Sequence, residues 1–461
     1  MAVAKWLQFV GVLLILTATS ACGIAHAADP RISLPLPAQL VLVKAQSLIQ
    51  AKQVARAIKT LQDFQARGGP APSPGEPDPQ GYHHPEIDFC LGNCFLMSKQ
   101  YKAAAAAYRR ALARDAGHTF AWLNLANANY ELNRHADAGR CFEKAYATAT
   151  EKKPEYLYYG AAAYLMAGDG RHAIDIFDRL ATGHPRAMKP EWNEYRVHAL
   201  LAANQSRRAL PLIRDLVRIY TGDKKIQWQE ILLQQYMQLE MSRQAIDLAQ
   251  DLARQNPTLA KWWKALAHVQ LNAGRYEAAL TALTVYSFLT PLTLEEKKLL
   301  ADLNLQLDIP VKAAPLYEAC LKAGSDKRVL RQLAIAYQQQ GQPERALAAI
   351  GKSGTALDPD ILMLKGELHY GLKQYKQAIS AYRQVAARNG SHAGRAWLMA
   401  GYAAWQMNDI AASKAAFARA AQYSKQRKAA NSALHRLPQA STGQADERLR
   451  LAHNTTPPTK R

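Results

Sequence analysis

One spacing dominates the sequence: a small side chain recurs every 32 to 36 residues along most of the 461-residue chain. An aromatic or branched apolar side chain follows most of these small residues four positions later. The small residues are Ala104, Ala138, Ala173, Ala209, Ala245, Ala279, Ala313, Ala346, Ala378 and Ser413. A small residue lets two helices approach closely, and the bulky residue one helical turn later fills the neighbouring hole. The period therefore predicts stacked helix–turn–helix units, which offer surfaces rather than enclosed catalytic pockets.

The most regular copy of the unit lies near residue 130. It comprises Trp122, Leu125, Ala126 and Tyr130 in a first helix, then Ala138, Phe142 and Ala145 in a second. This pattern resembles the tetratricopeptide repeat, and the resemblance spans roughly residues 85–423. It implies an all-α superhelical solenoid of about ten repeats with a concave face that binds protein partners. Copies around Trp192 and Trp228 are less regular, and the copy after Tyr156 requires an extra residue at Gly168-Asp169-Gly170.

Changes in composition divide the chain into five segments. We expect a signal peptide over 1–27, an N-terminal helical capping segment over 28–67, a Pro/Gly-rich linker over 68–84, a repeat array over 85–423 and a basic, largely disordered tail over 424–461. Proline fixes φ and lacks a backbone donor, so the third segment cannot sustain a helix. The last segment is basic, and its later half has few apolar residues with which to form a core.

The first thirty residues predict export. Lys5 precedes an apolar stretch that is shorter than the roughly 20 residues of a membrane-spanning helix. Ala25-His26-Ala27 then forms the small–any–small pattern of a signal-peptidase site, which predicts cleavage after Ala27 and a periplasmic mature protein. The alternative is lipidation of Cys22, although the usual leucine three positions earlier is missing.

The chain is strongly basic, with a formal net charge of +21 at pH 7. A surplus of this size indicates an anionic partner or surface. Because an exported protein rarely meets nucleic acid, we expect acidic proteins, anionic lipid head groups or envelope polymers instead. A role in solubility alone would produce the same composition.

No motif in the sequence predicts catalysis, a cofactor or a metal. There is no Gly-rich phosphate loop, nucleophile elbow or paired-histidine zinc motif. Cys90 and Cys94 are four residues apart on one predicted helix. Side chains at this spacing point in directions that are poorly suited to a disulfide between them, so buried free thiols are favoured. Together with His83 and His84 they match no standard zinc spacing. The alternative to a non-enzymatic protein is a thiol or metal-dependent enzyme built on Cys90 and Cys94.

The first helix of each early repeat supplies the candidate binding residues. They are Asn93, Phe120, Leu123, Asn127, Tyr130 and Tyr164. An asparagine side chain can bond both the N–H and the C=O of an extended peptide, and aromatic or leucine side chains provide apolar contact. The alternative is that these residues pack on neighbouring helices.

A second resemblance covers residues 291–314. This stretch is similar to exported tetratricopeptide proteins that accompany TonB–ExbB–ExbD systems in Gram-negative bacteria. The resemblance implies a periplasmic accessory that contacts inner-membrane motor components or their outer-membrane clients, and it carries no site residue. A scaffold for outer-membrane or envelope-polymer assembly is the alternative.

Overall fold

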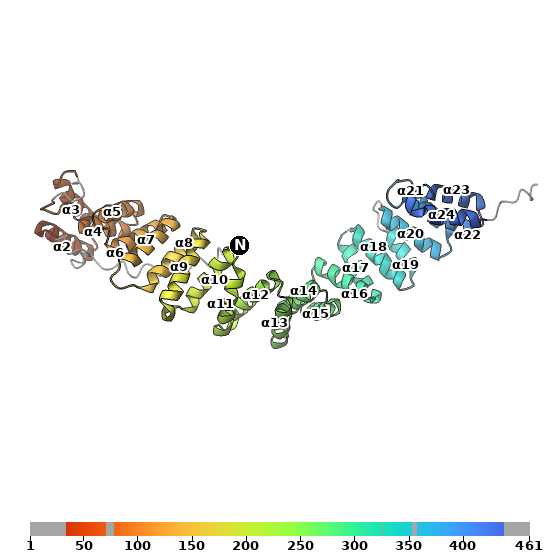
Figure 1. Cartoon of the computed structure of the whole chain (residues 1–461), viewed down its shortest axis with the longest axis horizontal. Helices are drawn as coiled ribbons and strands as arrows, with labels where there is room; N and C mark the ends of the chain where they lie inside the picture. Colours follow the sequence, from red (N-terminus) through yellow and green to blue (C-terminus); the bar gives the residue numbers. More distant parts are fainter. Residues whose placement is uncertain (1–33, 71–77, 325, 353–356, 438–461) are drawn as a thin grey trace, which may run out of the picture. The chain divides into compact units, whose positions relative to one another are not determined.

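The computed structural model of the protein describes residues 34–70, 78–324, 326–352 and 357–437. The described residues form 23 α-helices and no strand, so the predicted all-α repeat fold is confirmed. None of these helices is both long and apolar enough to cross a bilayer. The predicted signal peptide and Cys22 lie outside the described residues. The chain divides into two compact units, residues 1–241 and 242–461 (Figure 1).

The first unit consists of five antiparallel helix pairs, which follow one another along the chain, and one further helix. Its helices are α2 (Leu36–Gln50), α3 (Val54–Arg67), α4 (Pro85–Met97), α5 (Tyr101–Arg114), α6 (Thr119–Glu131), α7 (His135–Thr148), α8 (Pro154–Met166), α9 (Gly170–Gly183), α10 (Pro190–Ala202), α11 (Ser206–Ile219) and α12 (Gly222–Gln238). A 3-10 turn, Pro185–Ala187, precedes α10.

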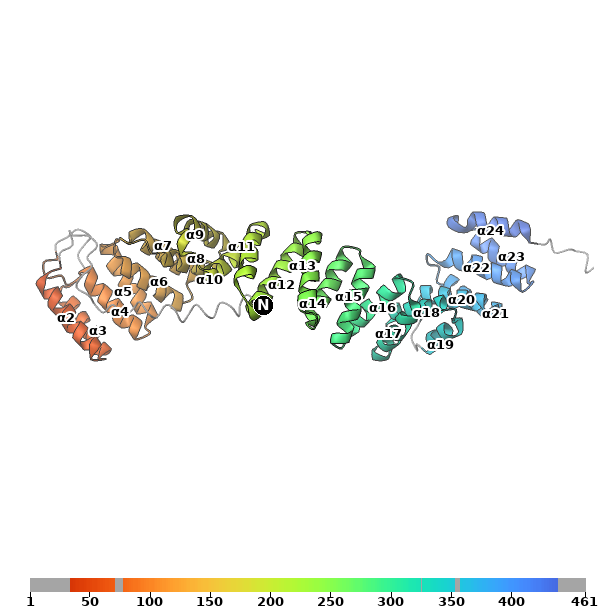
Figure 2. The ribbon, with the colours of Figure 1, turned by 90° about the horizontal axis from the view of Figure 1, so that it is seen from below.

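The second unit has the same construction (Figure 2). Its helices are α13 (Ser242–Gln255), α14 (Ala260–Asn272), α15 (Tyr276–Leu289), α16 (Leu294–Gln306), α17 (Pro310–Ala323), α18 (Lys327–Gln339), α19 (Pro343–Lys352), α20 (Pro359–Gly371), α21 (Tyr375–Ala386), α22 (Ala393–Gln406), α23 (Ile410–Ala420) and α24 (Ser424–Arg436).

The repeated small residues lie where the two helices of a pair meet their neighbours. Ala104 and Ala138 are fully buried, as are Tyr108 and Phe142 one turn later. Three glycines in the first helix of a pair make this packing closer still. A Cβ built on Gly92 would lie 2.5 Å from the Tyr108 ring. Glycine therefore allows the aromatic residue of the second helix to pack directly on the backbone of the first. The predicted packing code is therefore confirmed at these positions.

Every three-residue turn inside a helix pair has its second residue in the left-handed conformation. Glycine occupies this position three times; elsewhere a Lys, Asn, Asp or Glu has φ between 57° and 59°. These residues are Lys52, Lys99, Asn133, Asn204, Glu240, Asp308, Lys373 and Asn408. The left-handed residue lets the next N–H bond back into the first helix, as from Arg134 to the Asn129 carbonyl at 2.8 Å.

The turn at Gly168 has this same three-residue length, so the extra residue predicted at Gly168-Asp169-Gly170 is not there. The longer spacing instead comes from the connection between α7 and α8, residues 149–153, which exceeds the connection between α5 and α6, residues 115–118. Pro154 at the start of α8 fixes where that helix begins.

The end of the predicted linker packs on the N-terminal pair. The Asp78 carboxylate accepts hydrogen bonds from the backbone N–H groups of Tyr82 and His83 at 3.0 and 2.8 Å. The Tyr82 ring lies 4.8 Å from that of Phe64 in α3. Residues 78–84 are therefore an ordered loop that covers one end of α2 and α3.

The predicted basic tail begins with a helix. Residues 424–436 form α24, whose Ala433 is buried in a small core with Phe417 of α23 and whose Ala430 is also buried. The sequence patterning missed this helix because its apolar stripe consists mainly of alanines. The remainder of the predicted tail, from residue 438, lies outside the described residues.

Candidate protein-binding surface

Four of the six predicted binding residues lie on one side of α6. Phe120, Leu123, Asn127 and Tyr130 are spaced by three or four residues, so they share a helix face, which we call the α6 face. All four are partly exposed, and 38% of Phe120 is accessible. The Asn127 amide makes no side-chain hydrogen bond with any residue that the structure describes. The α6 face therefore combines apolar contact area with a free amide.

Asn93 does not belong to this surface. Its side chain is buried, and its carbonyl oxygen accepts hydrogen bonds from the Tyr108 hydroxyl at 2.7 Å and from the Asn124 amide at 2.8 Å. The predicted place of Asn93 among the binding residues is therefore wrong. Both are the ninth residue of their helix, but Asn124 of α6 covers Asn93 and satisfies its acceptor.

Tyr164 is also part of the packing between helices. It is 5% exposed, its ring contacts Gly139 of α7, and its hydroxyl donates to the Glu143 carboxylate at 3.2 Å. Burial, followed by the nearby Glu143 charge, raises the pKa of Tyr164 to about 12. Tyr164 is the eleventh residue of α8 and points toward α7. The prediction that it is a binding residue on the same surface as Tyr130 is therefore wrong.

The residue of α8 that corresponds to Leu123 is Tyr158, because each is the fifth residue of its helix. Tyr158 stacks on Trp192 of α10, with ring centroids 4.8 Å apart and an angle of 12° between planes. Tyr195 meets Tyr158 edge-on at 5.7 Å. We call these three residues the aromatic cluster.

The aromatic cluster lies on α8 and α10, the two first helices that follow α6 along the chain. Burial raises the pKa of Tyr195, and a hydrogen bond with Tyr158 opposes this rise. Tyr158 and Tyr195 are half-buried, whereas Trp192 is buried beneath them. Counting from Pro154, the start of α8, would have identified Tyr158 from the sequence.

A neutralised carboxylate lies beside the aromatic cluster. Glu194 is 5% exposed, and its carboxylate contacts the Lys224 ammonium at 2.5 Å and accepts the Tyr220 hydroxyl proton. Buried carboxylates persist in folded proteins when they are paired and hydrogen-bonded in this way. The surface around the cluster therefore carries no unpaired charge from Glu194.

The four cysteines that the structure describes are all buried. Cys94, Cys141 and Cys320 are free and buried, as predicted, but Cys90 is disulfide-bonded, so the prediction of a free thiol is wrong for that residue. Its bond is not to Cys94. Burial raises the pKa of the Cys94 and Cys141 thiols to about 11, which keeps both protonated at neutral pH.

One of the two histidines beside the cysteines caps a helix. The His84 Nδ1 accepts the backbone N–H of Glu86 at 3.2 Å and so caps α4. No group of three or more potential metal ligands occurs within the described ranges.

Successive helix pairs joined by three-residue turns define a helical-repeat protein. The family model for the tetratricopeptide repeat matches residues 42–119, 95–147, 331–393 and 363–433. Each of the two units therefore contains a segment that matches the tetratricopeptide repeat. Such repeats are typical of protein-binding scaffolds. No curated protein matches the sequence.

Several solved structures are similar to the chain. One is from the Naa15/Naa10 complex bound to HypK-THB, with 14% identity, a TM-score of 0.40, and coverage of 86% of this chain and 65% of that one. A tetratricopeptide repeat protein from Parabacteroides merdae ATCC 43184 has 12% identity, a TM-score of 0.30, and coverage of 65% and 98%. Yeast Tom70 has 12% identity, a TM-score of 0.29, and coverage of 89% and 96%. This chain thus spans about two thirds of the length of the chain from the Naa15/Naa10 complex.

Proposed function

We propose that the protein is a non-enzymatic scaffold that binds an extended segment of a protein partner across the α6 face and the aromatic cluster. The observation that carries this proposal is the Asn127 amide, which lies between Leu123 and Tyr130 without a hydrogen-bond partner among the described residues. An extended peptide satisfies such an amide through its own backbone, and the flanking side chains provide apolar contact.

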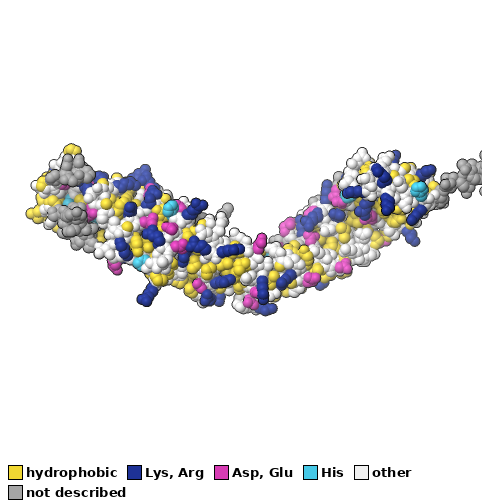
Figure 3. Space-filling model, in the orientation of Figure 1, with side chains coloured by type: hydrophobic (Ala, Val, Ile, Leu, Met, Phe, Trp, Pro, Cys, Tyr) yellow, Lys and Arg dark blue, Asp and Glu magenta, His cyan; other side chains and the backbone are white. Residues whose placement is uncertain are grey.

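The charge of the chain favours an acidic partner. Lys and Arg side chains are spread over the drawn face of each unit, without one dominant patch (Figure 3). A dispersed positive surface increases the rate of encounter with an anionic partner, whereas the contacts at the binding surface determine specificity.

We further propose that the scaffold acts in the periplasm as an accessory of TonB-type energy transduction. Export is supported by the Ala25-His26-Ala27 cleavage pattern, and the narrower role by the resemblance of residues 291–314. A mature N-terminus at Ala28 in the periplasmic fraction is the expected result of N-terminal sequencing. A lipid on Cys22 or a product that retains Met1 would contradict the proposed processing.

A photo-reactive amino acid at Asn127 tests the binding surface. We expect it to cross-link one protein in intact cells, whereas the same probe at Ala147, exposed on α7, should not capture that protein. Tyr130→Ala should reduce the amount of cross-linked product formed by the probe at Asn127. Equal capture from both positions would contradict the proposal. Capture of envelope-polymer enzymes rather than motor components would replace the TonB role with an assembly role.

A further inference from the structure

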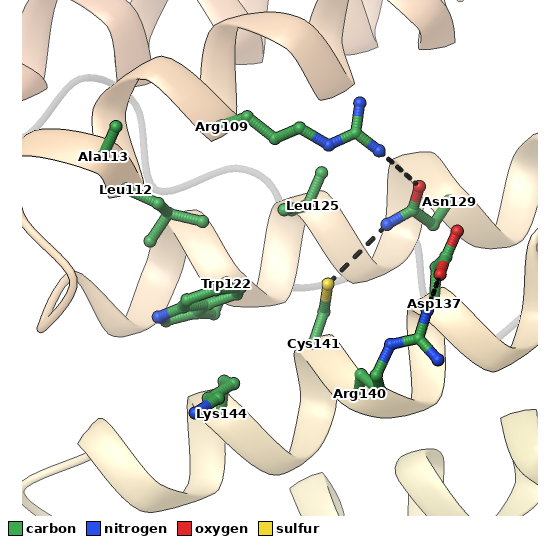
Figure 4. A pocket seen from close by; sticks show the side chains of 10 residues that line it. All are labelled: Arg109, Leu112, Ala113, Trp122, Leu125, Asn129, Asp137, Arg140, Cys141 and Lys144. Carbon is green, nitrogen blue, oxygen red and sulfur yellow. Dashed lines mark hydrogen bonds and ion pairs between the residues drawn. The ribbon is translucent and has the colours of Figure 1, made fainter.

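A second candidate site lies between α5 and α7, away from the α6 face. A cavity of about 450 Å³ is bounded by these two helices, with α6 as its floor (Figure 4). Its apolar lining includes Leu112, Leu125 and Cys141, which are buried, and the half-exposed Trp122. A volume of this size lies within the range of about 300 to 1,000 Å³ that is typical of ligand sites. We call it the α5–α7 cavity.

The rim of the α5–α7 cavity is positively charged. Arg109 lines it from α5, and Arg140 and Lys144 line it from α7. The carboxylate of Asp137 binds Arg140 of the same helix. Arg109 makes only a long hydrogen bond, 3.5 Å, to the Asn129 side chain, and Lys144 has no ion-pair partner among the described residues. Two cations at the rim are therefore without a counter-charge.

The next two grooves along the first unit are closed by ion pairs. Between α7 and α9, the Glu143 carboxylate lies 2.7 Å from the Arg179 guanidinium. Between α9 and α11, the Asp178 carboxylate lies 2.6 Å from the Arg208 guanidinium. Each of these pairs joins two successive second helices across the groove between them.

The α5–α7 cavity lacks such a pair because of one residue. Glu143 and Asp178 are the ninth residues of α7 and α9, and the ninth residue of α5 is Arg109. Lys144, the tenth residue of α7, corresponds to Arg179 of α9. The position that supplies a carboxylate in the next two grooves thus supplies a guanidinium here, and like charges do not close the groove.

We propose that the α5–α7 cavity binds a short peptide segment of a protein partner that pairs an acidic side chain with a neighbouring apolar one. The carboxylate takes the place that Glu143 has in the next groove and neutralises Arg109 and Lys144. The apolar side chain enters the cavity against Trp122 and Leu125. An arginine at the rim favours a carboxylate because its planar donors bind both oxygens.

Binding of a fluorescein-labelled hexapeptide of alternating glutamate and leucine to the full chain, followed by anisotropy, tests this site. Arg109→Glu places a carboxylate opposite Lys144, as in the α7–α9 groove, and should raise the dissociation constant at least tenfold without lowering the melting temperature. Lys102→Glu makes the same charge change on an exposed position of α5 outside the cavity and should leave binding within twofold. A peptide with glutamine in place of glutamate should bind at least tenfold more weakly.

Unchanged peptide binding by Arg109→Glu would overturn the proposal, as would equal losses for Arg109→Glu and Lys102→Glu. If Arg109→Glu fails to fold, Arg109→Gln provides the same comparison without charge reversal. Phosphatidylglycerol vesicles serve as the competing probe. Loss of vesicle binding with intact peptide binding in Arg109→Glu would assign the rim to a membrane surface and contradict a peptide site. Arg109→Glu leaves the residues of the α6 face unchanged, so a loss of hexapeptide binding in this variant is assigned to the α5–α7 cavity.

Discussion

The Tyr108 hydroxyl donates a hydrogen bond of 2.7 Å to the Asn93 side chain, inside the packing of α4 against α5. This contact assigns Asn93 to the stability of the fold rather than to binding. Removing the hydroxyl with Tyr108→Phe leaves the Asn93 oxygen with one remaining donor, Asn124. We expect a loss of about 1 kcal/mol in urea unfolding and no change in partner binding. Weaker binding without destabilisation would return Asn93 to the binding surface.

The left-handed turn residue at Lys99 is a site for stabilisation. A residue with a Cβ costs about 1 to 2 kcal/mol in this conformation, and glycine avoids most of that cost. Lys99→Gly should therefore raise the melting temperature or leave it unchanged. Ala106→Gly, at an exposed position in the interior of α5, should cost about 1 kcal/mol instead. Equal destabilisation by both substitutions would show that the turn is not strained at Lys99.

Acid should destabilise the protein through its buried histidines. Burial lowers the pKa of His84, His135 and His198 below 6.5, so the folded state binds fewer protons than the unfolded state. Stability is then constant above about pH 6.5 and falls as the pH drops from there through the folded pKa values. Thermal unfolding between pH 8 and pH 5 measures this. His84→Asn, which retains a capping side chain, should reduce the slope, and an unchanged slope would exclude His84 as a contributor.

Helix α24 should stabilise the end of the second unit. Truncation after Tyr423 removes Ala433 and Leu437 from the core around Phe417 and should lower the melting temperature. Truncation after Leu437 retains this core and should leave the melting temperature unchanged. Both truncations remove basic residues, so a loss of stability shared equally by the two would point to charge rather than packing.

The sequence predicted the parts of the fold that depend on local spacing. Ala138 and Phe142 recur because every pair of helices needs the same close approach, so their period identified the repeat. The extra residue assigned to the turn at Gly168 was misplaced because glycine in a turn and an insertion look alike in sequence. The two are distinguished only in the structure, where the turn at Gly168 has the same three residues as the other turns.

The binding surface was only partly predictable. A helix projection located Leu123, Asn127 and Tyr130 together because they share one helix. The same projection misplaced Tyr164, since an uncertain start of α8 rotates every later residue around the helix axis. The burial of Asn93 depends on Tyr108 and Asn124, which lie 15 and 31 residues away, and no periodic pattern reports such a contact.

The most direct test of the account is the affinity of the captured partner for variants of the α6 face, measured by calorimetry with the purified proteins. Tyr130→Ala should weaken binding by about 2 kcal/mol, because aromatic anchors dominate interfaces of this kind, and Asn127→Ala should weaken it by about 1 kcal/mol. Both variants should keep the circular dichroism spectrum of the wild type. Asn127→Ala should also keep its melting temperature, whereas Tyr130→Ala should lower it, because the Tyr130 ring packs against the core of its repeat. Wild-type affinity in both folded variants would contradict the account and place the partner on another surface.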